Sequence, residues 1–228
     1  MDPLDFIKVL AVTFLALFPV INPIGDAPIF FSLTRQYPQS VRKFLARKIA
    51  AYGFGLLAVS FLFGSEVLAF FGITLVVIQI TGGLIVAMTG WSLLNQEAAA
   101  FFVAQESDTM EDALEHAFYP LTLPITIDPG CIAVAITLGA HVRHQAGAGF
   151  AHGYPRHFIA ALAGIFLVCV LTGVCYGRSE RFLRMLGKSG TNILTRLSAF
   201  ILMAIGVQIM WNGLSSGLPE LLAHTAMR

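Results

Sequence analysis

The chain of 228 residues is strongly apolar: 57% of its residues are hydrophobic, only 12% are charged, and its mean hydropathy is +0.77. A soluble domain usually carries roughly a quarter charged residues. The composition therefore excludes a water-soluble enzyme and a disordered chain. The net charge of +1 gives no electrostatic footprint for a nucleic acid partner. What remains is an all-α polytopic membrane protein.

Six apolar segments are expected to cross the membrane. The first covers residues 6–33 and is interrupted by Asp26; it is expected to stay as a span rather than to be a cleaved signal. Residues 49–94 would form a helix of about 69 Å at about 1.5 Å per residue, against about 30 Å of hydrocarbon, so two spans with a turn within residues 64–72 are predicted. Residues 117–140, interrupted by Asp128, form the fourth span. Residues 158–176 and 197–218 form the last two.

Basic residues gather in two of the predicted loops. Of the 14 Lys and Arg residues, ten lie between spans one and two or between spans five and six: Arg35, Arg42, Lys43, Arg47, Lys48, Arg178, Arg181, Arg184, Lys188 and Arg196. The positive-inside rule places these loops in the cytoplasm and both termini in the periplasm. The acidic segment 97–116 is interpreted as a solvated linker. It divides the chain into residues 1–96 and 117–228.

Each half holds three spans, and three is odd, so the halves enter the membrane in opposite orientations. A shared fold would make them two inverted three-helix repeats with broken first helices. The sequence supports this with one matching break per half. The matching residues are Asn22, Pro23 and Gly25 in the first span, and Asp128, Pro129 and Gly130 in the fourth.

The two breaks predict a substrate site. Asn and Asp are preferred helix N-caps and proline is preferred at the next position, so Asn22-Pro23 and Asp128-Pro129 are each predicted to start a half-helix. Half-helix N-termini offer N–H groups to an anion, and carbonyls freed by proline suit an ammonium group or a cation. Together they match a zwitterion. The alternative is that the prolines only cap and kink the helices.

Asp26 and Asp128 are acids inside predicted spans. An intramembrane acid is costly and is a functional candidate by default. Asp128 is expected to act as a cap. Asp26 has no comparable cap position before a proline, so it is the better candidate to carry a proton or bind the substrate amine. An equally open alternative is that Asp26 bonds only to local backbone.

Residues 17–34, LFPVINPIGDAPIFFSLT, resemble the first signature of the MarC family of six-span bacterial inner-membrane proteins. Residues 119–140 resemble the second signature of that family, and Gly82-Gly83 of the third span fits as well. The resemblance implies an inverted arrangement of three plus three helices, distantly similar to LysE-type exporters, and transport of a neutral amino acid. Asp128 departs from the Gly-Pro-Gly expected there, which implies a different substrate or coupling ion.

The predicted function is inner-membrane transport or export of a small zwitterionic solute, a neutral amino acid, with a proton or cation as candidate coupling ion. No enzyme activity, cofactor or metal is expected; His141, His144, His152 and His157 match no ligand spacing and are interpreted as a polar loop. Two alternatives remain open: a non-transporting structural or envelope-stress role, and an intramembrane aspartyl enzyme using Asp26 and Asp128.

Overall fold

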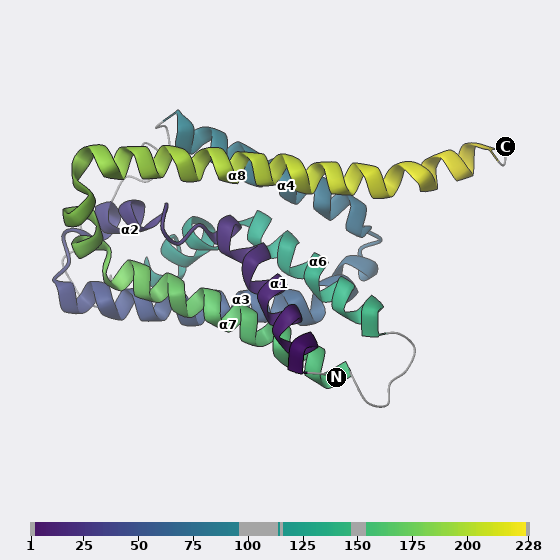
Figure 1. Ribbon diagram of the computed structural model, residues 1–228, viewed down its shortest axis with the longest axis horizontal. Helices are drawn as coiled ribbons and strands as arrows, with labels where there is room; N and C mark the ends of the chain where they lie inside the picture. Colours follow the sequence, from purple (N-terminus) through teal and green to yellow (C-terminus); the bar gives the residue numbers. More distant parts are fainter. Residues whose placement is uncertain (1–2, 96–113, 115, 147–153, 227–228) are drawn as a thin grey trace.

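The computed structural model describes residues 3–95, 114, 116–146 and 154–226, and all regular structure in these residues is helical. In chain order the elements are α1 (Pro3–Ile21), α2 (Ala27–Thr34), α3 (Gln39–Phe70), α4 (Leu75–Leu94), the π-helical η2 (Leu121–Thr126), α6 (Pro129–Ala146), α7 (Tyr154–Gly177) and α8 (Ser179–Ala226) (Figure 1). Most of the predicted acidic linker lies outside the described residues.

Five of the described helices are long and apolar enough to cross a membrane. A sixth span results if the bent pair His116–Thr126 and Pro129–His144 counts as one. The all-α polytopic architecture predicted from the sequence is therefore confirmed. The turn between the second and third spans lies at residues 71–74, because α3 continues to Phe70 and Gly72 then takes the left-handed φ of 68° that ends it. The turn overlaps the end of the predicted range of residues 64–72, which contains Gly72, and extends two residues beyond it.

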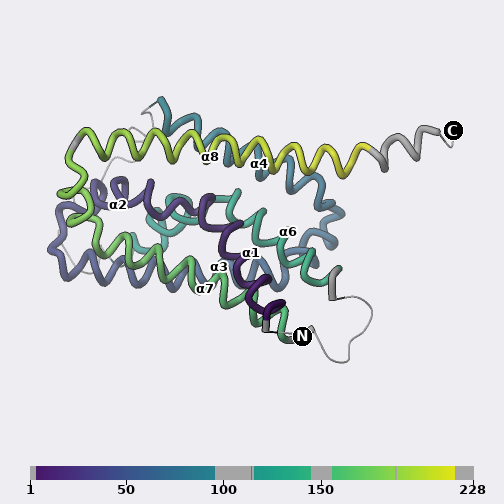
Figure 2. The backbone as a smooth tube through the Cα atoms, viewed as in Figure 1, coloured from purple at the N-terminus to yellow at the C-terminus, as the bar shows by residue number. Residues whose placement is uncertain are grey.

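The chain runs back and forth along the long axis of the molecule. The first turn of α1 and the end of α8 lie at one end, whereas the α2–α3 and α7–α8 junctions lie at the other (Figures 1 and 2). Helix α3 packs against α6 and α7, α1 against α7, and α4 against α8. The second span of each half thus meets the second span of the other half, and the third meets the third.

Small residues bring the backbones of α4 and α8 together. A Cβ placed on Gly83 would lie 2.6 Å from the carbonyl oxygen of Gly206, and one placed on Gly206 would lie 2.3 Å from the nitrogen of Ala87. Only glycine fits such a contact, and this is how helices commonly pack in lipid, where no hydrophobic effect drives them together. Helices α4 and α8 therefore pack backbone against backbone.

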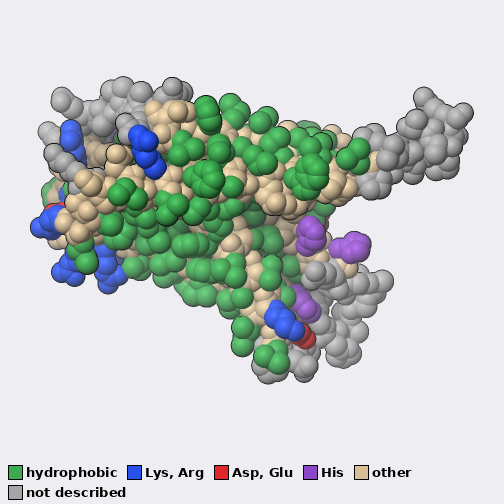
Figure 3. Space-filling view, turned by 45° about the horizontal axis from the view of Figure 1, so that its top comes forward, with side chains coloured by type: hydrophobic (Ala, Val, Ile, Leu, Met, Phe, Trp, Pro, Cys, Tyr) green, Lys and Arg blue, Asp and Glu red, His purple; other side chains and the backbone are tan. Residues whose placement is uncertain are grey.

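The surface matches a bilayer environment. On the face drawn in Figure 3, apolar side chains cover the middle, basic side chains gather at the end with the α7–α8 junction, and histidines lie at the opposite end. Many large apolar side chains are exposed, among them Leu15, Phe63, Phe166 and Phe200, each more than half exposed. In water such exposure would be costly, whereas lipid tails solvate these groups.

Candidate functional site

The first break joins α1 to α2 through a turn built around Asn22. Its backbone has a left-handed φ of 50°, which asparagine tolerates better than most residues. Its side-chain Oδ1 accepts a hydrogen bond from the Gly25 nitrogen at 3.2 Å, and its Nδ2 donates to Asp26 Oδ1 at 3.3 Å. The Asp26 nitrogen also donates to the Asn22 carbonyl at 3.0 Å. Asn22 therefore terminates α1 and holds the turn.

This geometry corrects the predicted role of the Asn22-Pro23 pair. The half-helix α2 begins at Ala27, so the N-cap position belongs to Asp26 and not to Asn22. The Asp26 side chain makes no capping hydrogen bond. The prediction gave Asp26 no cap position because Pro28 was not considered as part of a first helical turn, whereas Asp26 is the N-cap residue, Pro28 stands in the first turn of α2, and Asn22 takes a left-handed φ. The carboxyl of Asp26 is left buried beside the break.

The second break follows the prediction. Helix α6 begins at Pro129, directly after Asp128, whose Oδ1 accepts a hydrogen bond from the Cys131 nitrogen at 2.7 Å. This is the N-cap geometry expected of Asp before proline. The segments on either side, His116–Thr126 and Pro129–His144, are bent by 71°. The fourth span is thus broken in its middle with Asp128 at the corner.

The segment before this corner supplies its own polar partners. The nitrogens of Ile125 and Ile127 donate to the carbonyls of Pro120 and Thr122, five residues back, at 3.3 and 2.8 Å. The hydroxyl of Thr126 donates to the Leu121 carbonyl at 2.7 Å. These bonds satisfy backbone groups that the irregular helix would otherwise leave exposed to hydrocarbon.

One cavity contains both intramembrane acids. Its volume is about 530 Å³, and it lies between the two broken spans, α4 and α8. Its described lining residues are Val20, Asp26, Ile29, Ile85, Met88, Thr89, Ser92, Leu93, Pro124, Ile125, Thr126, Asp128, Pro129 and Leu202. None of them is basic. Small-molecule pockets are typically about 300–1,000 Å³ and mostly apolar with a few convergent polar groups, which describes this cavity.

The predicted site residues divide into two groups. Asp26, Asp128 and Pro129 line the cavity. Asn22, Pro23, Gly25 and Gly130 do not, and they shape the two breaks instead. A Cβ on Gly25 would lie 2.3 Å from Asn22 Nδ2, and one on Gly130 would lie 2.1 Å from Val86 Cγ2. Both glycines are needed for close approach, the first within its turn and the second against α4.

Sequence reasoning missed three polar residues of the cavity. Thr89 and Ser92 lie three apart in α4, so they share a helix face, and Thr126 lies at the end of η2. Two hydroxyl side chains at that spacing in an otherwise apolar span are a signal that the sequence does contain. Nothing in the sequence, however, indicates that this face of α4 turns toward the breaks.

Tyr176 contacts Thr126, one of the residues that line the cavity. Its hydroxyl lies 3.2 Å from Thr126 Oγ1, and its ring stacks on Phe30 with centroids 4.6 Å apart. Because the Thr126 hydrogen goes to the Leu121 carbonyl, Tyr176 is the donor of this bond. The contact ties α7 to η2 and, through Phe30, to α2.

The comparisons with known proteins identify the family. Residues 7–218 match the family described as MarC family integral membrane protein. The chain belongs to the MarC family. The resemblance of residues 17–34 and 119–140 to the MarC signatures is thereby confirmed. No solved structure matches this chain.

Relatives from distant organisms match almost the whole chain. "UPF0056 membrane protein YvbG" of Bacillus subtilis is 31% identical over 210 residues, which are 91% of this chain and 95% of the relative. "UPF0056 membrane protein MJ1677" of Methanocaldococcus jannaschii is 31% identical over 90% of this chain and 95% of its own length. "UPF0056 inner membrane protein MarC" of Salmonella typhimurium is 30% identical over 92% and 96%. These MarC family names specify a membrane protein and no substrate.

Proposed function

We propose that this MarC family protein is an inner-membrane transporter or exporter of a small zwitterionic solute, a neutral amino acid. The observation that carries the proposal is the cavity of about 530 Å³ in which both broken spans place a carboxyl group. Unwound backbone at membrane depth is tolerated where it lines a cavity, and transporters use such breaks to hold polar substrates.

Asp26 is the proposed binding group for the substrate ammonium. Its Oδ1 accepts from Asn22, and its side chain makes no cap bond with α2, so the carboxyl has acceptor capacity left for a solute. Asp128 Oδ1 is engaged by the Cys131 nitrogen at the start of α6. Asp26 is therefore also the better candidate to exchange a proton with the coupling gradient.

The remaining lining residues suit an amino acid of modest size. Val20, Ile29 and Leu202 provide an apolar wall for an aliphatic side chain. The starts of α2 and α6 are the two candidate positive helix ends for the substrate carboxylate, and the start of α2 has N–H groups that the Asp26 side chain does not bond. The start of α6 is a poorer choice for that carboxylate, because Asp128 already caps it.

Two ion pairs fit a mechanism in which the halves rock against each other. Arg42 of the first half pairs with Glu180 of the second, and Arg143 of the second half pairs with Glu66 of the first. Arg42 and Glu66 lie 24 residues apart on α3, about 36 Å along a helix, so the pairs lie toward opposite ends of the molecule. If residues 1–96 and 117–228 form an inverted repeat, each ion pair would break when the cavity opens to the side of the membrane on which that pair lies.

The proposed location is a bacterial inner membrane with both termini in the periplasm. Relatives named inner membrane protein support the membrane, and the basic end of the molecule supports the orientation.

The shared cavity also keeps the intramembrane aspartyl enzyme as a second candidate. Such a site needs two carboxyls that share a proton. In the described residues Asp26 is bonded to Asn22 and Asp128 to Cys131, and no hydrogen bond joins the two acids. Two carboxyl groups with different partners do not form the shared-proton pair that the enzyme would need, so this arrangement favours the transporter.

Flux in reconstituted vesicles tests the proposal. Uptake and efflux of a panel of labelled amino acids are measured with and without a proton gradient. Asp26→Asn should reduce flux by about 10- to 100-fold, since hydrogen bonds to charged groups contribute about 1.5–3 kcal/mol. Asp128→Asn should be milder because Asn caps helices about as well as Asp, and Asp128→Gly should keep flux with altered substrate preference.

The matched control is Asp5→Asn, which removes a half-exposed acid from the first turn of α1. It should transport as the unaltered protein does. No flux of any amino acid by the unaltered protein would favour the structural or envelope-stress role. Normal flux by Asp26→Asn at matched protein levels would reduce Asp26 to a local hydrogen-bond partner.

A further inference from the structure

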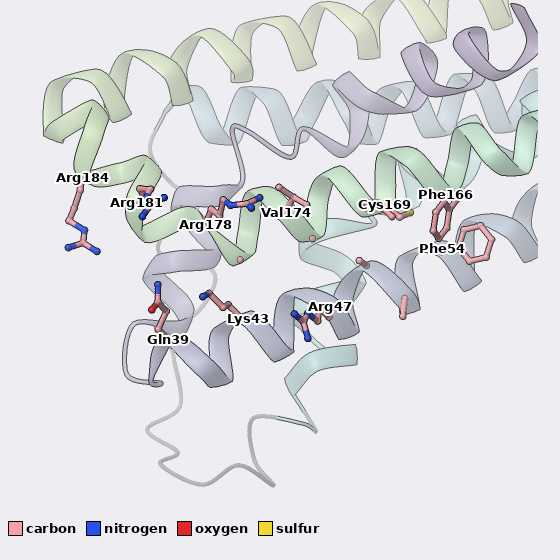
Figure 4. A pocket seen from close by; sticks show the side chains of 15 residues that line it. Gln39, Lys43, Arg47, Phe54, Phe166, Cys169, Val174, Arg178, Arg181 and Arg184 are labelled. Atoms are coloured by element: carbon pink, nitrogen blue, oxygen red, sulfur yellow. The ribbon is translucent and has the colours of Figure 1, made fainter. Parts of the chain in front are cut away.

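A second and larger cavity lies along the α3–α7 pair. Its volume is about 970 Å³, and it runs between α3 and α7 to the α7–α8 junction (Figure 4). Its polar end carries five basic side chains, which are Lys43, Arg47, Arg178, Arg181 and Arg184. Its other end is apolar. We refer to it as the α3–α7 groove.

The basic end of the groove is built from two helices. Lys43 and Arg47 lie four apart on the first turns of α3 and share a helix face. Arg178, Arg181 and Arg184 follow one another at intervals of three around the start of α8, so consecutive members of this set are neighbours. Arg184 pairs with Glu180 at 3.0 Å. The other four side chains are exposed and have no ion-pair partner among the described residues. Within the part of the chain that the structure describes, the basic end of the groove therefore carries an excess of positive charge.

The floor of the groove is made of small residues. A Cβ on Gly173 would lie 3.0 Å from Ala50 Cβ and 3.3 Å from the Ala46 carbonyl, so α3 and α7 approach closely there. Beyond this point Phe54 and Phe166 meet edge to face, with ring centroids 5.7 Å apart, and close the apolar end. The apolar part of the groove thus runs over small residues and ends at an aromatic pair.

The length of the groove matches one leaflet of a bilayer. Lys43 and Phe54 are 11 residues apart on α3, about 16 Å along the helix. Half of a hydrocarbon core of about 30 Å is about 15 Å. The basic end thus lies at headgroup depth when the phenylalanine pair lies near the bilayer centre.

We propose that the α3–α7 groove binds one acidic phospholipid of the leaflet that faces the basic end. Its phosphate lies among Lys43, Arg47, Arg178 and Arg181, and one acyl chain follows the small-residue floor to Phe54 and Phe166. Clusters of basic residues beside transmembrane helices attract anionic headgroups. A second copy of this chain fits less well, because a two-fold contact would bring the same basic residues face to face.

Native mass spectrometry of the purified full chain in neutral detergent tests this site. Phosphatidylglycerol and phosphatidylcholine of identical acyl chains are titrated separately, and glycerol phosphate supplies the headgroup without chains. We expect one tightly bound phosphatidylglycerol and much weaker retention of phosphatidylcholine. Equal retention of the two lipids would refute the proposal.

Two kinds of variant separate the headgroup from the chain. Arg47→Gln with Arg181→Gln should weaken phosphatidylglycerol binding about 30-fold, on the expectation of about fivefold for each basic residue. The control, Arg35→Gln with Arg196→Gln, removes two exposed basic residues outside the groove and should leave binding unchanged. Equal losses in both double variants would mean a diffuse surface effect and would overturn the site.

Ala51→Trp fills the exposed floor of the groove with an indole. It should weaken phosphatidylglycerol binding and leave the weak competition by glycerol phosphate as it was. Conversion of a dimeric protein to a monomer by this variant, with lipid binding intact, would show that a second copy occupies the groove and would overturn the proposal.

Discussion

Adding one methyl group at Gly130 tests how the start of α6 is held against α4. The new Cβ would lie 2.1 Å from Val86 Cγ2, whereas carbon atoms in contact are about 3.5–4.0 Å apart, so about 1.5 Å of separation is needed. Val86 is fully buried in α4, and valine in a helix has one strongly preferred rotamer, so its methyl cannot swing aside. Overpacking of this kind costs about 1–3 kcal/mol. We expect Gly130→Ala to lower the free energy of unfolding by about 2 kcal/mol.

Val86→Ala provides a rescue. It removes the clashing methyl, after which the contacts nearest to the added Cβ are Asp128 Oδ1 at 3.2 Å and the Gly82 carbonyl at 3.3 Å, both tight but tolerable. Alone, Val86→Ala should cost about 2 kcal/mol through lost packing. The double variant should be more stable than the sum of the two single effects predicts, by at least about 1 kcal/mol.

Equilibrium unfolding of the purified protein in mixed detergent, followed by tryptophan fluorescence, measures these differences. Gly55→Ala is the matched control, because a Cβ at this exposed helical position meets nothing within 4 Å. It should be neutral or slightly stabilising, since alanine favours helix over glycine. An unchanged stability of Gly130→Ala, or strict additivity in the double variant, would refute the reasoning that α4 and α6 are in contact through this glycine.

Three further predictions address the arrangement of the helices. A reporter enzyme that works only outside the cytoplasm should be active when it is fused to the C-terminus. If a reporter that works only in the cytoplasm is active there instead, the assigned orientation is reversed. Glu180→Gln should lower the free energy of unfolding by about 1–3 kcal/mol, because it removes the carboxylate charge that pairs with the buried Arg42 guanidinium, which keeps the Tyr37 carbonyl at 2.7 Å and the Phe31 ring as neutral contacts. A double-mutant cycle with Arg42→Gln isolates the pair, and a coupling near zero would contradict this prediction. Gly139→Ala should lower the free energy of unfolding by at least about 2 kcal/mol in the same assay, because its Cβ would lie 2.0 Å from the Phe61 carbonyl oxygen. Stability equal to that of Gly55→Ala would show that α3 and α6 do not touch there.

The spans themselves are determined by the sequence. Long apolar stretches leave only helices as a way to satisfy the backbone in lipid, and residues 49–94 are too long for one crossing. The break at Asp128 is equally local, because an Asp followed by Pro is both a cap and a first helical residue. The predicted cap at Asp128 was therefore correct.

The local rules were insufficient at the first break. Sequence reasoning took Asn22-Pro23 as the helix start and gave Asp26 no cap position, whereas α2 begins directly after Asp26. The choice depends on which turn the surrounding helices accommodate, with Phe30 stacked on Tyr176 from a segment almost 150 residues away. That contact joins α2 to α7, and no pattern within the first span contains it.

The cavity depends on tertiary structure even more. Sequence reasoning named Asp26 and Asp128 because acids in lipid are costly, and the fold brings both into one space. It had no means of adding Thr89 and Ser92, because hydropathy locates a span along the chain but leaves open how the helix is rotated about its axis. That rotation is restricted where a glycine of one helix meets another helix closely: Gly83 meets the Gly206 backbone, and Gly130 meets a methyl of Val86. Composition therefore determined that the chain crosses the membrane, whereas close packing between helices decided which side chains face the two breaks.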